Sequence, residues 1–296
     1  MTPVLRLQGW VFCGLALAFV VASLVGARLA PLHELLAAGA LIALLGMPHG
    51  AFDVVFARKL FGVVDFQGWV LFSLLYVGLS AAVVGFWFVA PTPFLCAFLL
   101  CSALHFGGDL AAGASTFARC WYGGAVIVLP ALWHGPELQR LLGLVAGPAS
   151  AAFVVPVLSQ MAAPWLAAAA LACVLQARTS RLAASELATL TALSLAAPPL
   201  LAFTVYFCAM HSPRHILRTL ASLPGVEVRN ALALALWPTL AALSALSALA
   251  VIGGMPSNKS MDAWVMQLVF VGLAALTLPH MVLLERARRV GMPAHR

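Results

Sequence analysis

Charged residues are scarce in this chain. Only 8% of its 296 residues are Asp, Glu, Lys or Arg, whereas 64% are hydrophobic and the mean hydropathy is +1.04. A water-soluble domain has no means of hiding so much apolar surface. Polar stretches long enough for a soluble domain are missing as well. We therefore expect a single polytopic membrane domain over residues 1–296, with a short basic tail over 285–296.

Other absences exclude further classes of protein. The apolar runs lack the alternation of apolar and polar residues that marks transmembrane β-strands, which argues against a membrane barrel. The 16 Lys and Arg residues are scattered singly instead of forming a basic face, so we expect no nucleic-acid partner. None of the six cysteines has C-x-x-C spacing. We expect them to be small buried hydrophobes instead of a redox or metal motif.

Apolar runs bounded by Pro, Gly or charge predict an all-α integral membrane protein, a polytopic bundle of about eight to ten transmembrane helices. The first run is long enough to cross and more spans follow, so we interpret it as a mature helix and not as a signal peptide. Proline and Gly147-Pro148 interrupt the fifth to seventh segments, which are the least regular. The predicted spans are 10–27, 34–57, 67–90, 93–112, 119–134, 141–160, 163–178, 186–210, 230–253 and 263–284.

Basic residues predict the orientation of these spans. When ten spans are counted, eleven of the 16 Lys and Arg residues fall on the side that holds the N-terminus. The positive-inside rule assigns that side to the cytoplasm. We therefore expect a multi-pass protein of the cell membrane, in contact with membrane lipid, with both termini in the cytoplasm.

Ionisable residues inside the predicted spans are the strongest functional signal, because such residues are expensive in a membrane unless they are paired or functional. The four spans that carry the candidate residues are even-numbered, so they run toward the same side, and the histidines lie in their C-terminal halves. We expect one site at one depth, near the cytoplasmic side. The residues are His49 and Asp53 in the second span, His105 and Asp109 in the fourth, His211 and His215 in the eighth, and His280 in the tenth.

The segment FCAMHSPRHI holds the only H-x3-H pair of the chain. Four residues make about one helical turn, so His211 and His215 can project from one face toward one metal ion. Pro213 lies between them and predicts a kink. A competing interpretation is that Arg214, Arg218 and these histidines mark where an apolar helix meets anionic lipid headgroups.

The other two pairs combine histidine with aspartate at the same spacing, His49 with Asp53 and His105 with Asp109. The spacing places each carboxylate one turn from its imidazole, where it could bind the same metal or accept the other ring proton. A lone intramembrane histidine more often bridges helices by a hydrogen bond. For the set at one depth, imidazole and oxygen donors favour a first-row metal such as non-haem iron or copper.

The order and the residue sequences of four motifs resemble those of a known family. The motifs are Gly46-Met-Pro-His-Gly-Ala-Phe-Asp53, His105-Phe-Gly, His211-Ser-Pro-Arg-His215 and Pro279-His-Met281. Together they are similar to the Brp/Blh family of bacteriorhodopsin-related β-carotene 15,15'-dioxygenases. This resemblance implies a membrane enzyme that uses Fe2+ and O2 to cleave the central double bond of β-carotene into two all-trans-retinal molecules. A retinal-accepting rhodopsin is a partner that the resemblance suggests.

The resemblance also implies the site residues. It assigns the iron to His49, His105, His211 and His215, and it matches His280 to a further recurrent histidine, either a fifth ligand or a supporting residue. Asp53 and Asp109 follow from spacing alone, as residues that orient the ligands. Aromatic side chains near the histidines are candidate walls of a substrate slot, although ordinary helix packing would explain them equally well. These are Phe52, Phe106, Tyr206 and Phe207.

Three other functions compete with this one. A membrane hydroxylase, ketolase or desaturase with non-haem iron generally has eight or more histidines clustered in H-x3-4-H and H-x2-3-H-H boxes. This chain has only one H-x3-H pair. A bis-histidine haem electron carrier would place imidazoles on opposite faces of a porphyrin and would show a Soret band. A metal or proton transporter would carry polar residues at several depths of the membrane. Spacing alone does not choose between a carotenoid, a sterol, a quinone and an acyl chain as substrate.

Overall fold

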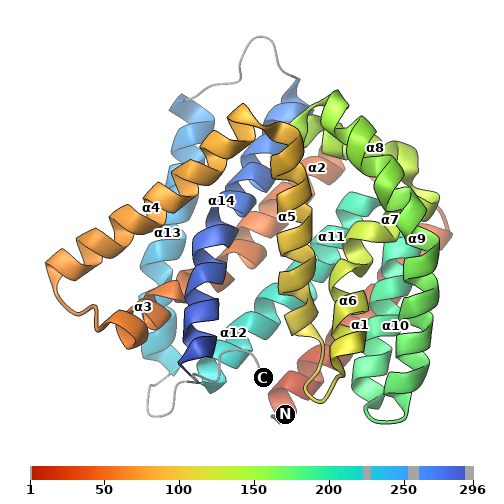
Figure 1. Cartoon of the computed structure of the whole chain (residues 1–296), viewed down its shortest axis with the longest axis horizontal. Helices are drawn as coiled ribbons and strands as arrows, with labels where there is room; N and C mark the ends of the chain where they lie inside the picture. The colour runs from red at the N-terminus through yellow and green to blue at the C-terminus, as the bar shows by residue number, and fades with distance from the viewer. Residues whose placement is uncertain (1, 223–227, 253–259, 291–296) are drawn as a thin grey trace.

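The computed structural model describes residues 2–222, 228–252 and 260–290, and all regular elements in these ranges are helical. Figure 1 shows their arrangement. The α-helices are α1 (Pro3–Leu24), α2 (Pro31–Leu41), α3 (Asp53–Phe61), α4 (Phe66–Val89), α5 (Pro91–Phe106), α6 (Thr116–Val128), α7 (Pro130–Trp133), α8 (Gly135–Ala146), α9 (Pro148–Ala177), α10 (Arg181–Ala196), α11 (Pro199–Tyr206), α12 (Ser212–Ala221), α13 (Val228–Ile252) and α14 (Met261–Arg289).

Among the described residues, six helical segments are long and apolar enough to cross a membrane. This confirms the expected all-α, polytopic membrane protein. The boundaries of most segments follow from proline, which is pre-organised for the first turn of a helix; α1, α2, α5, α9 and α11 all begin at one. The six segments are Pro3–Leu24, Pro31–Phe61, Phe66–Val89, Pro91–Asp109, Pro148–Ala177 and Met261–Arg289.

The predicted boundaries were wrong in the middle of the chain. The two spans expected at 141–160 and 163–178 are replaced by the short α8 and the 30-residue α9, which continues through Pro156 and Pro164. The span expected at 186–210 is two helices, because α10 ends at Ala196 and α11 begins at Pro199. Two consecutive prolines cannot continue an α-helix, since each lacks the backbone donor.

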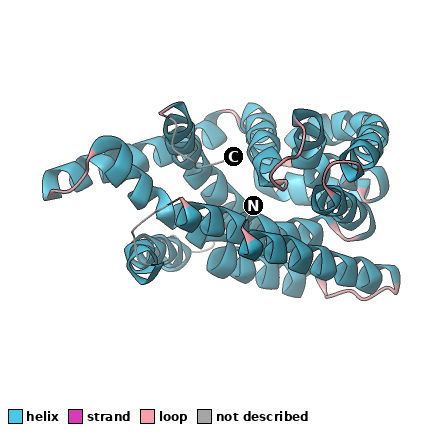
Figure 2. Ribbon diagram, turned by 90° about the horizontal axis from the view of Figure 1, so that it is seen from below, coloured by secondary structure: helices cyan, strands magenta, loops and turns pink. Residues whose placement is uncertain are grey.

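The helix directions bring distant motifs to one level. In Figure 1, α2 with α3, α5, α11 with α12, and α14 all run from the top of the view toward the bottom, so their C-terminal halves lie in the lower part. Figure 2, the view from below, shows the helices of the bundle packed against one another and joined by loops. On one flank α1, α9, α6 and α10 pack together, and on the other α4 packs against α14 and α5. The expected common depth of the histidine-bearing segments is thereby realised.

A close helix crossing holds α5 against α6. A Cβ atom added to Gly123 would overlap the backbone carbonyl of Ala103 and would lie 2.6 Å from the backbone nitrogen of Gly107. Backbone atoms cannot rotate away as a side chain would, so only glycine permits this approach. The crossing positions the end of α5, where His105 is found.

We predict that Gly123→Ala destabilises the protein by about 1–3 kcal/mol, the usual cost of overpacking. The matched control is Gly14→Ala on α1, where an added Cβ would meet no atom within 4 Å. The control should be neutral or slightly stabilising, because alanine favours helix by roughly 1 kcal/mol over glycine. Thermal unfolding in detergent measures both, and equal midpoints for the two variants would contradict the close crossing.

Candidate metal centre

Five imidazoles meet where the four histidine-bearing segments converge. His211, His215 and His280 have exposed fractions of 1%, 1% and 2%, and His49 has 8%. The ring centroids of His49 and His211 are 4.8 Å apart, as are those of His105 and His211. His215 and His280 lie 4.9 Å apart. The structure thus brings together all the histidines that the sequence placed at one depth.

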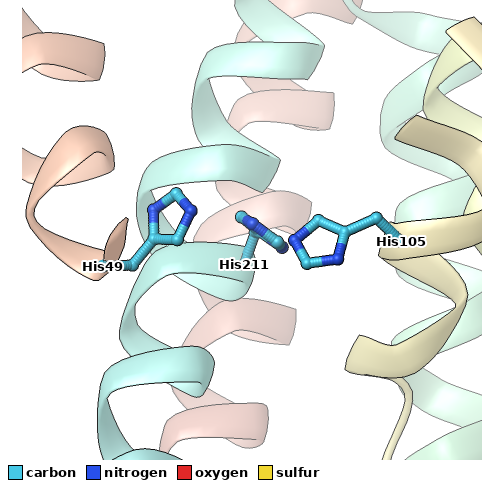
Figure 3. A group of neighbouring side chains, drawn as sticks. All are labelled: His49, His105 and His211. Atoms are coloured by element: carbon cyan, nitrogen blue, oxygen red, sulfur yellow. The ribbon is translucent and has the colours of Figure 1, made fainter. Parts of the chain in front are cut away.

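Three of these side chains form a group that could hold a metal ion. One ring nitrogen from each of His49, His105 and His211 lies within 4.8 Å of the other two. Figure 3 shows the three rings entering from different parts of the chain, with His211 between the other two. Imidazole nitrogen is a good donor to first-row metals such as iron, copper and zinc, so the group suits an ion of that class.

Two of the five rings are fixed by carboxylates. His211 donates from Nδ1 to Asp109 Oδ2 at 2.8 Å, and His280 donates from Nδ1 to Asp53 Oδ1 at 2.7 Å. A histidine that binds a metal through one nitrogen usually donates its other N–H to a carboxylate or a carbonyl. With Nδ1 engaged, Nε2 is the nitrogen that each ring presents to the cluster.

The sequence placed each aspartate one turn from the histidine four residues earlier, where it could bind the same metal or accept the ring proton, but the hydrogen bond of Asp53 goes to another segment. Asp53 bonds to His280 of α14, and the observed bond of Asp109 also crosses to another helix. The reason is local geometry, because Met47–Phe52 forms a 3-10 helix. At three residues per turn, positions four apart diverge by about 120° around the axis.

Two π-helical turns shape the backbone of the centre. They cover Ile42–Gly46 and Phe207–His211, and each ends two residues before a proline, Pro48 or Pro213. The kink predicted at Pro213 therefore takes the form of a widened turn just before it. Single π turns inside α-helices are frequent at functional sites, and here one ends three residues before His49 and the other ends at His211.

The widened turn before Pro48 leaves carbonyl groups that side chains satisfy. The Gly46 carbonyl accepts a hydrogen bond from His49 Nδ1 at 2.5 Å. The Leu45 carbonyl accepts one from the Ser212 hydroxyl at 2.6 Å. Irregular backbone is tolerated at membrane depth only where such partners exist. The second bond also ties this segment to the start of α12.

The aromatic residues predicted to line a substrate slot have different surroundings. Phe106 and Phe207 contact the cluster, with ring centroids 5.0 and 5.1 Å from that of His211. Tyr206 is fully buried and donates its hydroxyl to a carboxylate of the site. Phe52 packs in a separate apolar cluster with neighbours from its own segment, from α12 and from α13. The structure therefore places three of the four beside the imidazoles.

The sequence interpretation of Arg214 as a headgroup contact was wrong. Its side chain has no exposed surface and forms an ion pair with the equally buried Glu186, at 2.7 Å. Its guanidinium also donates to Gln8 Oε1 at 2.7 Å and to the Asp109 carbonyl at 2.8 Å. Glu186 and Gln8 were missed altogether. Glu186 could have been noticed as an acidic residue among apolar neighbours, which inside a membrane calls for a partner.

Three arginines clamp the turn that follows α5. Arg119, Arg214 and Arg218 donate hydrogen bonds to its backbone carbonyls, and Arg218 also has only 9% exposure. The clamp satisfies carbonyls that a helix end leaves without partners. It also fixes the carboxylate that holds His211. The acceptor carbonyls belong to Gly107, Gly108, Asp109, Leu110 and Ala111.

An apolar pocket adjoins the cluster. It lies between α5, α6, α8, α9, α11 and α14, and its lining includes Leu95, Leu99, Phe106, Phe203 and Phe270. Phe106 faces both the pocket and the imidazoles, because its ring also contacts that of His211. A concave, mainly apolar site next to a few polar groups is the usual form of a small-molecule site.

Fold and site together define a polytopic membrane protein with a buried histidine centre able to hold a metal, beside an apolar pocket. The sequence model of the family described as "Beta-carotene 15,15'-dioxygenase" matches residues 40–286. The chain therefore belongs to the β-carotene 15,15'-dioxygenase family, which confirms the family resemblance found in the motifs.

Two relatives are similar over most of their length. The chain is 30% identical to "Beta-carotene 15,15'-dioxygenase" of uncultured marine bacterium 66A03, over 83% of this chain and 91% of the relative. It is 29% identical to "Probable beta-carotene 15,15'-dioxygenase Blh" of Halobacterium salinarum, over 97% of this chain and 93% of the relative. No solved structure matches the chain.

We predict that Glu186→Gln destabilises the protein by about 3–5 kcal/mol, because it leaves the buried charge of Arg214 without its partner. The control is Glu285→Gln, which removes exposed ion pairs with Arg288 and Arg289 and should cost only about 0–1 kcal/mol. Thermal unfolding in detergent compares them. Equal stability of the two variants would show that the buried pair does not support the fold.

Proposed function

We propose that this protein cleaves the central 15,15' double bond of β-carotene with O2, giving two all-trans-retinal molecules, at an iron ion held by the histidine cluster. The observation that carries the proposal is the group of buried His49 and His211 with half-buried His105, whose nitrogens converge within 4.8 Å inside an apolar helical bundle. His215 completes the proposed ligand set. Its ring centroid lies 5.5 Å from that of His49.

The residues present fit a non-haem iron ion. All the proposed ligands are imidazoles, and Gly46 and Asp109 fix two of them through Nδ1. When bound, iron supplies the redox chemistry with dioxygen that no side chain can perform. The chain contributes orientation and a dry surrounding, because Phe106 and Phe207 cover the imidazoles with apolar surface. Excluding water protects a reactive site from side reactions.

The apolar pocket is our candidate for one arm of the substrate. A polyene carries no polar group, so shape and apolar contact decide which bond lies at the metal. The pocket is a small cavity of about 90 Å³, and a carotenoid arm is long and rigid. We therefore expect lining side chains such as Met266, which is flexible, to move when substrate enters from the bilayer.

We also propose an orientation of the chain in the membrane. The segments that carry histidines run in one direction in Figure 1, and the excess of basic residues lies at their C-terminal ends and at the N-terminus. By the positive-inside rule the centre lies toward the cytoplasmic face. We propose that the chain is one membrane domain with both termini in the cytoplasm.

We predict that cells accumulating β-carotene produce retinal when they express this chain. His49→Ala and His215→Ala should abolish retinal formation and leave carotene intact, since each removes a proposed ligand. Pigment extraction with chromatography measures both compounds, and membrane fractionation checks insertion. Intact carotene despite inserted, iron-loaded wild-type protein would refute β-carotene as the substrate.

A second prediction tests the pocket. Leu99 lines the pocket, whereas the adjacent Leu100 is 61% exposed on the outer side of α5. We expect Leu99→Trp to reduce retinal formation several-fold by filling the pocket, with unchanged iron content. Leu100→Trp should have little effect, because its side chain faces the surrounding lipid. Equal activity of the two variants would mean that the substrate binds elsewhere.

A further inference from the structure

Only three tyrosines occur in the chain, and two of them end in hydrogen bonds to the carboxylates of the centre. Tyr76 of α4 donates its hydroxyl to Asp53 Oδ2 at 2.9 Å. The other carboxylate oxygen of Asp53 accepts from His280 Nδ1 at 2.7 Å. Tyrosine, aspartate and histidine thus form a continuous chain of hydrogen bonds from α4 through α3 to α14.

A second chain of the same composition enters from the other side. Tyr206 donates to Asp109 Oδ2 at 2.5 Å, and the same oxygen accepts from His211 Nδ1 at 2.8 Å. His211 belongs to the group whose nitrogens converge as a metal site. The ring that ends the first chain is therefore held in the same manner as a ring already placed among the metal-binding candidates.

His280 lies beside three of the other imidazoles. Its ring centroid is 5.3 Å from that of His49, 5.4 Å from that of His105 and 4.9 Å from that of His215. Imidazoles surround it on several sides, so one ion among them would be near its ring. Its exposed fraction is 2%, so bulk water does not reach the ring.

The second ring nitrogen distinguishes a ligand from a structural bridge. Among the described residues, His280 Nε2 is buried and has no hydrogen-bond partner. Nδ1 carries the proton that Asp53 accepts, so Nε2 presents a lone pair. A buried acceptor without a partner is costly. A bridge between helices explains the bond at Nδ1 alone, whereas a bound metal ion would also give Nε2 a partner.

We propose that His280 is an additional ligand of the metal ion in the histidine cluster, and that Asp53 and Tyr76 are its positioning residues. This rests on the proposed function, because it assumes that the cluster holds a metal. It gives a role to α4, none of whose described residues is buried. Through Tyr76, this peripheral helix supports the centre.

The test uses the full-length protein in detergent, loaded with Fe2+ or with Co2+ as a spectroscopic probe. Metal content and affinity are measured, and the visible absorption of bound Co2+ reports its ligands. His280→Ala should alter the Co2+ spectrum and lower metal affinity. Asp53→Asn and Tyr76→Phe should keep the general form of the spectrum and lower affinity by roughly 10–100-fold, as loss of a residue that supports a ligand usually does.

The matched control is Tyr122→Phe. Tyr122 is fully buried, and its hydroxyl has no hydrogen-bond partner within the described part of the chain, so this variant should bind metal like the wild type. Wild-type affinity and Co2+ spectrum in His280→Ala would overturn the proposal. Should His280→Ala fail to fold, Tyr76→Phe decides, because unchanged affinity there would equally overturn it.

The same experiment separates the two proposals. A wild-type protein that binds neither Fe2+ nor Co2+ would contradict the proposed function itself, and with it the ligand role of His280. Wild-type protein that binds metal, with His280→Ala indistinguishable from it, would contradict only the ligand role. Reduced affinity in both Tyr76→Phe and Tyr122→Phe would indicate a general loss of packing and would refute the specific support by Tyr76.

Discussion

The buried ion pair between Arg214 and Glu186 is the interaction on which the geometry of the centre depends. Neither side chain has any exposed surface. Arg214 lies directly before His215 in α12, and its guanidinium also holds the carbonyl of Asp109, whose carboxylate orients His211. Buried charges are tolerated only when partners satisfy them fully. Because the buried guanidinium of Arg214 needs these partners, the pair fixes α12, α10 and the turn after α5 relative to one another.

Irregular helices then determine where the histidines point. A regular α-helix through Met47–Phe52 would have placed Asp53 one turn from His49, whereas the 3-10 turn directs it toward His280. The π turns before Pro48 and Pro213 change the phase of the helices just before His49 and at His211. Such turns survive inside a membrane because neighbouring side chains satisfy the carbonyls that they release. The irregular backbone and the polar network therefore depend on each other.

Support for the centre comes from outside the histidine-bearing helices as well. Gln8 of α1 and Glu186 of α10 hold Arg214, and Tyr76 of α4 holds Asp53. These residues lie far apart in the sequence, so the order of the centre requires the bundle to be assembled. Side chains that are already oriented lose little conformational entropy when they bind a ligand, so a preorganised site favours one geometry.

The sequence by itself determined the membrane class, the helical fold and the set of five histidines, because hydropathy and intramembrane polarity are local properties of the chain. It also supported the family through ordered motifs. Only the tertiary structure decided the helix breaks at 196–199, the crossed pairing of Asp53 with His280 and the partners of Arg214. Those features depend on contacts between residues distant in sequence, and a turn's choice between α, 3-10 and π geometry follows from such contacts rather than from spacing.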